Sequence, residues 1–301
     1  EAYGLPPAGL TITIGYGPSL FDGRFGLASR KPAALQPLPA FTNDALEPAL
    51  SGGDICFQAC ANDPQVAVHA VRNLARMGSG VVAVRWSQLG FGRTSSTSTT
   101  QQTPRNMFGF KDGTANLKAE DPTALAKHVW VDKADVPGAA GWMAGGSYLV
   151  ARRIRMHIEV WDRSTLQDQE MTFGRAKASG APLGQTGEFD AIDFAKKGPD
   201  GAPLIDVNSH VKLAHKSNLG GVEILRRGYN FTDGSDGLGH LNAGLFFVAF
   251  CRDAHRQFVP MQKALSNRDL LNEYIVHNGS ALFACPPGLD ATNDWGKQLF
   301  G

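Results

Sequence analysis

A carboxylate stands in unusual surroundings at residues 109–114, where the chain reads GFKDGT. An Asp-Gly pair on its own is typical of an exposed turn. Here apolar residues flank Asp112, so its side chain can lie against a core rather than in water. The glycines on both sides leave room for a ligand to approach the backbone closely. Asp112 is therefore a candidate proton-transfer group, with an exposed turn aspartate as the alternative.

A histidine and a pair of arginines form the second candidate group. His210 lies in SHVKLAH, and sixteen residues later the β-type run EILRRGYNF carries Arg226 and Arg227. A histidine that binds a metal needs its other ring nitrogen held by an acceptor. Asp294, in the C-terminal stretch ATNDWG, is the acidic candidate for that role. The residues alone leave His210 open between a metal ligand and an ordinary structural histidine.

Alternating and helical apolar patterns surround these residues and must position them. Alternation predicts strands at 10–15, 54–60, 81–86, 147–161, 244–251 and 281–285. Helical spacing predicts helices at 64–77, within 122–131 before a short strand, at 253–265 and at 268–277. Residues 94–104 read as a polar loop. The pattern predicts two related α+β halves, each an antiparallel sheet with helices on one face.

Composition limits the class of protein. With 301 residues, 43% hydrophobic and 19% charged, the chain is an ordinary globular sequence with room for a sizeable core. A formal net charge of +1 gives no electrostatic case for nucleic acid or an anionic membrane as partner. No run of eighteen apolar residues occurs, so no membrane span is expected. The first residues do not read as a signal peptide.

The four cysteines allow few disulfides. On one strand face, Cys56 and Cys60 would lie roughly 13 Å apart, which is too far for a bond between them. Cys251 and Cys285 each end a strand-like run and could pair if those strands are adjacent. Buried free thiols are the alternative.

Five motifs occur in one order along the chain: GFKDGTAN, GGSY before a long strand ending in EVWDR, TFGR with GAPLG, SHVKLA and LRRGYNF. Their order and spacing resemble the dye-decolourising peroxidases, specifically the exported bacterial branch that includes the deferrochelatase-type proteins. The resemblance covers essentially the whole chain. It implies a duplicated ferredoxin-like α+β fold, with an N-terminal half at 1–140 and a haem-binding C-terminal half at 141–301. We expect the first half to lack its first strand and helix.

The resemblance also implies a cofactor and a site. One haem b per chain is expected, with His210 as the axial iron ligand and Asp112 and Arg226 as the catalytic residues on the peroxide side. Asn116 and Arg152 would lie near the haem propionates. Further haem contacts are implied for Gly113 and Thr114.

The implied reaction reduces hydrogen peroxide through an oxoferryl intermediate and oxidises dyes or other one-electron donors. Asp112 would move the proton, and Arg226 would stabilise the departing negative oxygen. Because bulky dyes cannot reach a buried haem, electrons would cross the protein, with Tyr229 and Tyr274 as candidate relays or as simple packing residues. Export by the twin-arginine route is expected from the same resemblance.

Two other functions are weighed against this one. A haem-binding or deferrochelatase-type protein of iron handling, with incidental peroxidase activity, would need neither Asp112 nor Arg226. A glycine-rich secreted binding domain without haem would be colourless and would take up no added haemin. The presence of both Asp112 and Arg226 favours the peroxidase.

Overall fold

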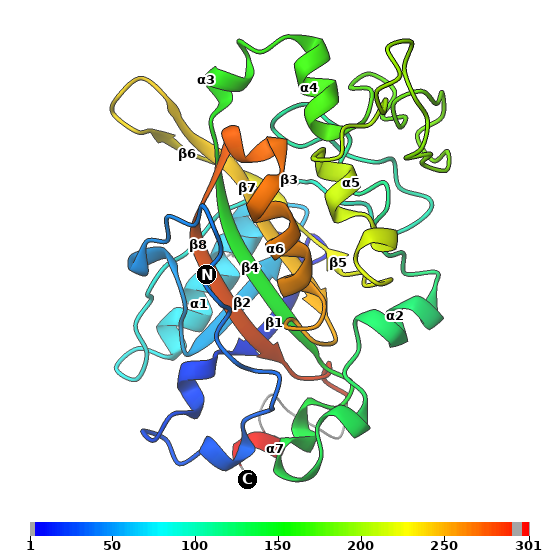
Figure 1. Ribbon diagram of the computed structural model, residues 1–301. Helices are drawn as coiled ribbons and strands as arrows, with labels where there is room; N and C mark the ends of the chain where they lie inside the picture. The colour runs from blue at the N-terminus through cyan, green and yellow to red at the C-terminus, as the bar shows by residue number, and fades with distance from the viewer. Residues whose placement is uncertain (1–3, 291–296, 301) are drawn as a thin grey trace.

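Hydrogen-bonded strands form the frame of the computed structural model, which describes residues 4–290 and 297–300. They join in an eight-stranded sheet of order β2-β1-β8-β4-β7-β6-β3, and β5 also pairs with β7 (Figure 1). Every pairing between these strands is antiparallel. The strands are β1 (Thr11–Tyr16), β2 (Ile55–Cys60), β3 (Phe91–Arg93), β4 (Ser147–Met156), β5 (Leu225–Arg226), β6 (Tyr229–Ser235), β7 (Leu241–Cys251) and β8 (Ile275–Cys285).

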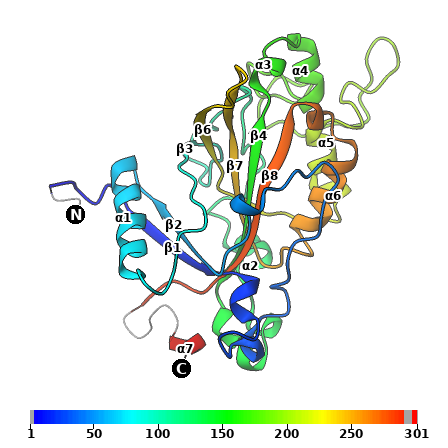
Figure 2. The same ribbon diagram turned by 90° about the vertical axis from the view of Figure 1, so that its left-hand side faces the viewer.

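Helices lie on both faces of the sheet. Figure 2 shows α5 and α6 on one side of β4 and β8, with α1 on the opposite side against β1 and β2. The short 3-10 helix η7 (Leu270–Glu273) follows α6 directly. The α-helices are α1 (Pro64–Met77), α2 (Pro122–His128), α3 (Ile158–Trp161), α4 (Leu166–Phe173), α5 (His210–Ala214), α6 (Phe258–Arg268) and α7 (Lys297–Phe300). The architecture is α+β, as the sequence predicts.

The central strand β4 is buried on both faces. Tyr148 and Val150 lie in one apolar cluster with Phe258 of α6. The alternate residues Leu149 and Ala151 lie in a second cluster on the other face of the sheet. Successive side chains of a strand point to opposite faces, so one strand supports both halves of the core.

Helix α1 has the bounds that the sequence predicts, because its ends carry strong local signals. The Asp63 carboxylate caps the helix by accepting a hydrogen bond of 2.8 Å from the Gln65 backbone N–H. Pro64 occupies the first turn, where a missing N–H costs nothing. Gly78 ends the helix and bonds back to the Leu74 carbonyl at 3.2 Å.

Three predicted strands differ from the structure. Residues 81–86 form no strand; instead Arg85 and Trp86 donate their side-chain hydrogen bonds to the carbonyls of Ser51 and Gly52. The predicted strand 147–161 ends at Met156, and α3 follows it. Residues 129–131 after α2 are likewise not a strand. Alternation alone does not supply the neighbouring strand that a ladder needs.

All four cysteines are free thiols. Strand β4 separates β7 from β8 in the sheet, so Cys251 and Cys285 lie two strand spacings apart, about 10 Å. A disulfide needs its Cα atoms within about 7 Å. The condition for a disulfide between these two residues, adjacent strands, is not met, and the alternative of buried free thiols is confirmed for them.

The helices of the described ranges 4–290 and 297–300 include none with both the length and the apolar character needed to cross a bilayer.

Candidate functional site

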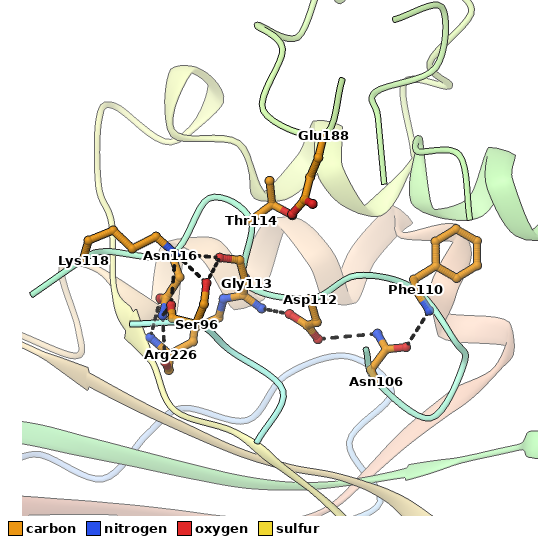
Figure 3. A network of polar contacts seen from close by, with 10 residues as sticks. All are labelled: Ser96, Asn106, Phe110, Asp112, Gly113, Thr114, Asn116, Lys118, Glu188 and Arg226. Atoms are coloured by element: carbon orange, nitrogen blue, oxygen red, sulfur yellow. Dashed lines mark hydrogen bonds and ion pairs between the residues drawn. The ribbon is translucent and has the colours of Figure 1, made fainter. Parts of the chain in front are cut away.

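Asp112 and Arg226 form an ion pair at the centre of a polar network (Figure 3). The Nη1 group of Arg226 donates to Oδ1 of Asp112. Arg226 comes from β5, whereas Asp112 comes from the loop that leads to α2. Their side chains are 28% and 12% exposed, so both are largely removed from water without being sealed. A permanent positive charge is thus fixed beside a carboxylate.

The loop carrying Asp112 is held by Asn106 and by a tight backbone contact. The Asn106 side chain donates to Oδ2 of Asp112 at 3.4 Å and accepts the backbone N–H groups of Phe108 and Phe110 at 3.1 and 3.3 Å (Figure 3). The backbone N–H of Asp112 donates to the Pro104 carbonyl at 2.8 Å. Both carboxylate oxygens therefore have partners, which fixes the direction in which the carboxylate points.

The backbone conformation and the close packing at position 113 require a glycine. Its φ is +97°, in the region that favours glycine. A Cβ at this position would lie 2.8 Å from the Ser95 Cα and 2.9 Å from the Ser96 nitrogen, so rigid backbone would have to move. The predicted haem contact at Gly113 is thus also a close packing point between the Asp112 loop and residues 95–96.

Asn116 holds the backbone of Arg226. Its Nδ2 donates to the Arg226 carbonyl at 2.9 Å and to the Ser96 carbonyl at 3.0 Å, and its Oδ1 accepts the Arg226 N–H at 2.8 Å. The side chain is buried and its amide is engaged on both ends. The structure therefore gives Asn116 a positioning role toward Arg226, beyond the propionate contact that the sequence predicts.

His210 is paired with a buried carboxylate. Its Nδ1 lies 2.6 Å from Oδ2 of Asp269, and the side chain of Asp269 is 2% exposed whereas that of His210 is 34% exposed. Burial by itself would lower the pKa of His210, but the negative charge and hydrogen bond of Asp269 outweigh it, so the pKa is raised. The predicted partner Asp294 falls outside the described residues. Asp269, and not a residue near the C-terminus, is the carboxylate that contacts Nδ1 of His210 in the described residues.

Asp269 has a local role of its own, which gives no indication of its partner. Asp269 begins the turn after α6, where its Oδ1 accepts the Leu271 N–H at 2.9 Å and caps η7. An aspartate that starts a short helix is common, and nothing in its local pattern connects it with His210, 59 positions earlier.

His210 lies within electrostatic reach of the Asp112–Arg226 pair. The pKa of His210 is affected by burial and by Asp269 first, and then in opposite senses by the charges of Asp112 and Arg226. Phe173, at the end of α4, contacts the His210 ring edge-on at 5.9 Å and stacks on Phe110 at 4.2 Å. One aromatic ring thus connects the histidine with the Asp112 loop.

Glu188 is a site residue that the sequence analysis missed. Its carboxylate accepts from the Lys111 ammonium at 2.5 Å and from the Thr114 hydroxyl at 3.0 Å, so it contacts residues on both sides of Asp112. The Glu188 carbonyl also accepts from Arg175 at 3.0 Å. Thr114, a predicted haem contact, is engaged here with Glu188 (Figure 3). No sequence motif marks Glu188.

Lys118 was also missed. Its ammonium donates to the Ser96 hydroxyl at 2.6 Å and to the Ser96 carbonyl at 3.1 Å. Burial, followed by the positive charge of Arg226, lowers the pKa of Lys118. The ammonium therefore adds a second cation on the same side of the site as Arg226.

Arg152 lies on β4 in a network of its own. Its guanidinium pairs with Asp44 and donates to the Ser280 hydroxyl at 3.0 Å, and it lies over the Phe41 ring at 5.3 Å. The side chains of Arg152 and Asp44 are only 1% and 7% exposed. The Nε of Arg152 is buried and has no hydrogen-bond partner within the described residues. A propionate contact for Arg152 stays a prediction.

The two candidate relay tyrosines have different surroundings. Tyr274 is buried and packs edge-on against Trp161, with 4.9 Å between the ring centres. Tyr229 is half-buried, and its hydroxyl donates to the Cys60 sulfur at 3.4 Å. Packing accounts fully for Tyr274, whereas Tyr229 contacts a group that can itself be oxidised.

The donor set fits a haem. With its Nδ1 engaged by Asp269, His210 has Nε2 left for an axial metal bond, and a carboxylate behind the imidazole is the usual second partner of a ligating histidine. The aromatic cluster of Phe108, Phe110, Trp161 and Phe173 supplies apolar surface beside it. The paired carboxylate and arginine, Asp112 and Arg226, are groups of the kind that can move a proton and stabilise negative charge on a small peroxide.

Comparison with known proteins agrees with this geometry. The family model described as Dyp-type peroxidase, C-terminal, matches residues 103–290, and the model for the N-terminal part matches residues 2–92. The deferrochelatase of Escherichia coli (strain K12) is 40% identical over 298 residues, covering 97% of this chain and 68% of that protein. The deferrochelatase of Yersinia pseudotuberculosis is 39% identical over 295 residues, covering 97% and 67%.

Solved structures of DyP-type peroxidases are also similar to this chain. Ferric DtpA from Streptomyces lividans superposes with a TM-score of 0.89 at 37% identity, covering 97% of this chain and 78% of that one. The DyP-type peroxidase from Cellulomonas bogoriensis gives 0.88 at 39% identity, covering 97% and 79%. Together with the two matching family models, these similarities show that the chain belongs to the Dyp-type peroxidase family.

Proposed function

We propose that the protein is a haem b peroxidase that reduces hydrogen peroxide and oxidises dyes or other organic one-electron donors. The observation that carries the proposal is the Asp112–Arg226 ion pair, which lies within electrostatic reach of the Asp269-paired His210. Simple storage or transport of haem requires no carboxylate–arginine pair opposite the iron ligand.

One haem per chain would be held through Nε2 of His210, the ring nitrogen that Asp269 leaves unengaged. Bound haem would supply the iron that accepts peroxide and takes up its oxidising equivalents. We propose haem contacts for Gly113, Thr114, Asn116 and Arg152 as well. Of these, Asn116 also fixes the Arg226 backbone through two hydrogen bonds.

The chain's own groups account for the proton and charge movements. Asp112 would accept a proton from peroxide at a carboxylate oxygen and return it to the leaving oxygen. Arg226 would stabilise the negative charge that develops there, because its guanidinium stays charged at all relevant pH values. Asn106 orients Asp112 by donating to Oδ2 at 3.4 Å. His210 is held in one tautomer, with its Nδ1 proton donated to Asp269.

A second candidate is a haem- or iron-handling protein. It is supported by relatives named deferrochelatase that are 40% identical to this chain. In that case Asp112 and Arg226 would be dispensable, and the product to measure would be iron released from added haem.

The test compares haem-loaded wild type with Asp112→Ala, Arg226→Ala and His210→Ala, following the Soret spectrum after one equivalent of peroxide. We expect one or both distal variants to react about 10²- to 10⁴-fold more slowly, and His210→Ala to lose or shift the Soret band. Arg256→Ala, at a side chain that is 86% exposed, is the matched arginine control. Equal bleaching of wild type and distal variants, together with iron release, would favour iron handling.

We further propose that the protein is exported, by the twin-arginine route, after its cofactor is bound. We also propose that the chain consists of two halves, 1–140 and 141–301. Cell fractionation of the full-length gene product tests the first, and limited proteolysis of the purified protein tests the second.

A further inference from the structure

A tyrosine and a cysteine from distant parts of the chain meet outside the polar network of the candidate site. The hydroxyl of Tyr229 donates to the sulfur of Cys60 at 3.4 Å. Tyr229 begins β6 and Cys60 ends β2, and both side chains are half-buried. The two side chains belong to different strands that do not pair with each other. A contact of this kind joins two side chains that can each lose one electron.

The tyrosine is neutral and carries its proton. Burial, followed by the hydrogen bond to Cys60, raises the pKa of Tyr229, while the neighbouring Arg227 guanidinium opposes the change. The phenol therefore keeps the proton that it would have to release when an electron is removed. Because the Tyr229 side chain is only half-buried, solvent can take up that proton.

The register of the sheet places this pair close to the Asp112–Arg226 site. Arg226 of β5 pairs with Ala249 of β7, and Tyr229 of β6 pairs with Phe246, so β5 and β6 keep the same register against β7 on both sides of the break at 227–228. Three residues of strand span about 10 Å, and an odd offset puts the two side chains on opposite faces. Tyr229 therefore lies about 10 Å from Arg226 along the strand direction. It is on the opposite face of the sheet, where Phe246 packs against Trp86.

We propose that Tyr229 and Cys60 form a redox pair, through which oxidising equivalents leave the site and oxidise the Cys60 thiol when no external donor is present. The proposal rests on the proposed peroxidase function, which supplies the oxidant. It makes Cys60 a specific modification site and Tyr229 the residue that connects it with the site.

The electrons and atoms balance. Tyr229 gives one electron to the oxidised site and its hydroxyl proton to solvent; the resulting phenoxyl then takes a hydrogen atom from Cys60, so an S–H bond breaks and an O–H bond forms. A second electron leaves by the same route, and water adds to the sulfur with loss of a proton. The thiol is oxidised to a sulfenic acid while one hydrogen peroxide is reduced, giving one net water.

The test is made on haem-loaded protein treated with one equivalent of peroxide, without a donor and in the presence of dimedone, which traps sulfenic acids. Mass spectrometry of the digested protein reads the adduct at each cysteine. We expect the adduct at Cys60, a decrease of at least about fivefold in Tyr229→Phe, and protection of Cys60 by excess dye. Cys56, four residues earlier on the same strand, is the internal control because its sulfur lies beside Gly15 instead of a tyrosine hydroxyl.

A second readout does not depend on the adduct. In Cys60→Ser the phenoxyl loses its hydrogen-atom donor, so we expect a tyrosyl radical signal in electron paramagnetic resonance that persists longer than in wild type. Cys56→Ser should leave the lifetime unchanged.

Three outcomes would overturn the proposal. Equal adduct at Cys60 in wild type and Tyr229→Phe would mean that peroxide attacks the thiol directly. Peroxide-driven Soret changes and dye oxidation with no adduct at Cys60 would reject the redox pair and leave the peroxidase function intact. If wild type shows neither Soret changes nor dye oxidation, the proposed function and the redox pair are rejected together.

Discussion

Nδ1 of His210 and Oδ2 of Asp269 are 2.6 Å apart, although the two residues are 59 positions apart in the chain. The carboxylate is buried, whereas a third of the imidazole is exposed. The ring is therefore fixed from its buried edge and left accessible on the other. Such an arrangement orients a histidine for metal binding before any metal arrives.

Asp269→Asn should weaken haem binding by about 10- to 100-fold, because an amide no longer supplies the charged acceptor that fixes the imidazole. Titration with haemin, followed by the Soret band, measures the affinity. Asp121→Asn is the matched control, since Asp121 also caps a helix by accepting a backbone N–H, at 2.9 Å, but lies at α2. Equal affinities in the two variants would contradict the role of Asp269.

Gly113→Ala should slow the reaction with peroxide strongly while leaving haem bound through His210. A methyl group would meet the backbone of Ser95 and Ser96 at 2.8–2.9 Å and displace the adjoining Asp112. Gly201 also has a positive φ, +79°, but open space around it, so Gly201→Ala isolates the cost of the backbone conformation. Stopped-flow spectra compare the two, and equal rates would show that Asp112 tolerates the displacement.

Breaking the buried ion pair of Arg152 and Asp44 should destabilise the protein severely. Asp44→Asn leaves the Arg152 charge uncompensated inside the core, at a cost of about 3–5 kcal/mol. Replacing both partners, as in Asp44→Asn with Arg152→Met, should recover part of that loss because no charge remains buried. Urea unfolding measures each variant, and additive losses in the double variant would argue against coupling between the two charges.

The free energy of unfolding should decrease as the pH is lowered, because of His277. Burial, with the charge of Arg152 as a smaller contribution, lowers the pKa of His277 from 6.5 to about 3. Below pH 6.5 the unfolded chain binds a proton that the folded protein does not bind until near pH 3. The free energy of unfolding therefore decreases as the pH drops through this window, by up to about 1.4 kcal/mol per pH unit from this group.

Removal of the titrating group should flatten that dependence. We expect His277→Gln to lose less stability than wild type between about pH 7 and about pH 5, measured by urea unfolding at each pH. Parallel curves for the two proteins would assign the pH dependence to other groups.

Sequence patterns predicted those features that depend on residues close together in the chain. Helix α1 was predictable because Asp63, Pro64 and Gly78 mark its ends locally. The family resemblance implies one site for Asp112, Arg226 and His210; the structure pairs Asp112 with Arg226 and His210 with Asp269, and the common site stays a prediction.

Features that depend on strand order and on distant partners could not be predicted. Whether Cys251 and Cys285 could pair stayed open, because β4 inserts between their strands and no local pattern specifies that insertion. The same limit hid Asp269 and Glu188, whose partners are 59 and 74–77 positions away. Residues 81–86 have the composition of a strand, but their side chains bond to carbonyls of the loop at 51–52.

The segment between Phe173 and His210 has a consequence for how the cofactor is acquired. It starts at a ring that touches both Phe110 and His210, is tied near its middle by Glu188 to Lys111 and Thr114, and ends at His210 itself. Both walls of the site are therefore fastened by one stretch of chain. We expect haem to enter when this stretch opens locally, so that uptake of added haemin is slow and is followed by protection of the stretch from proteolysis.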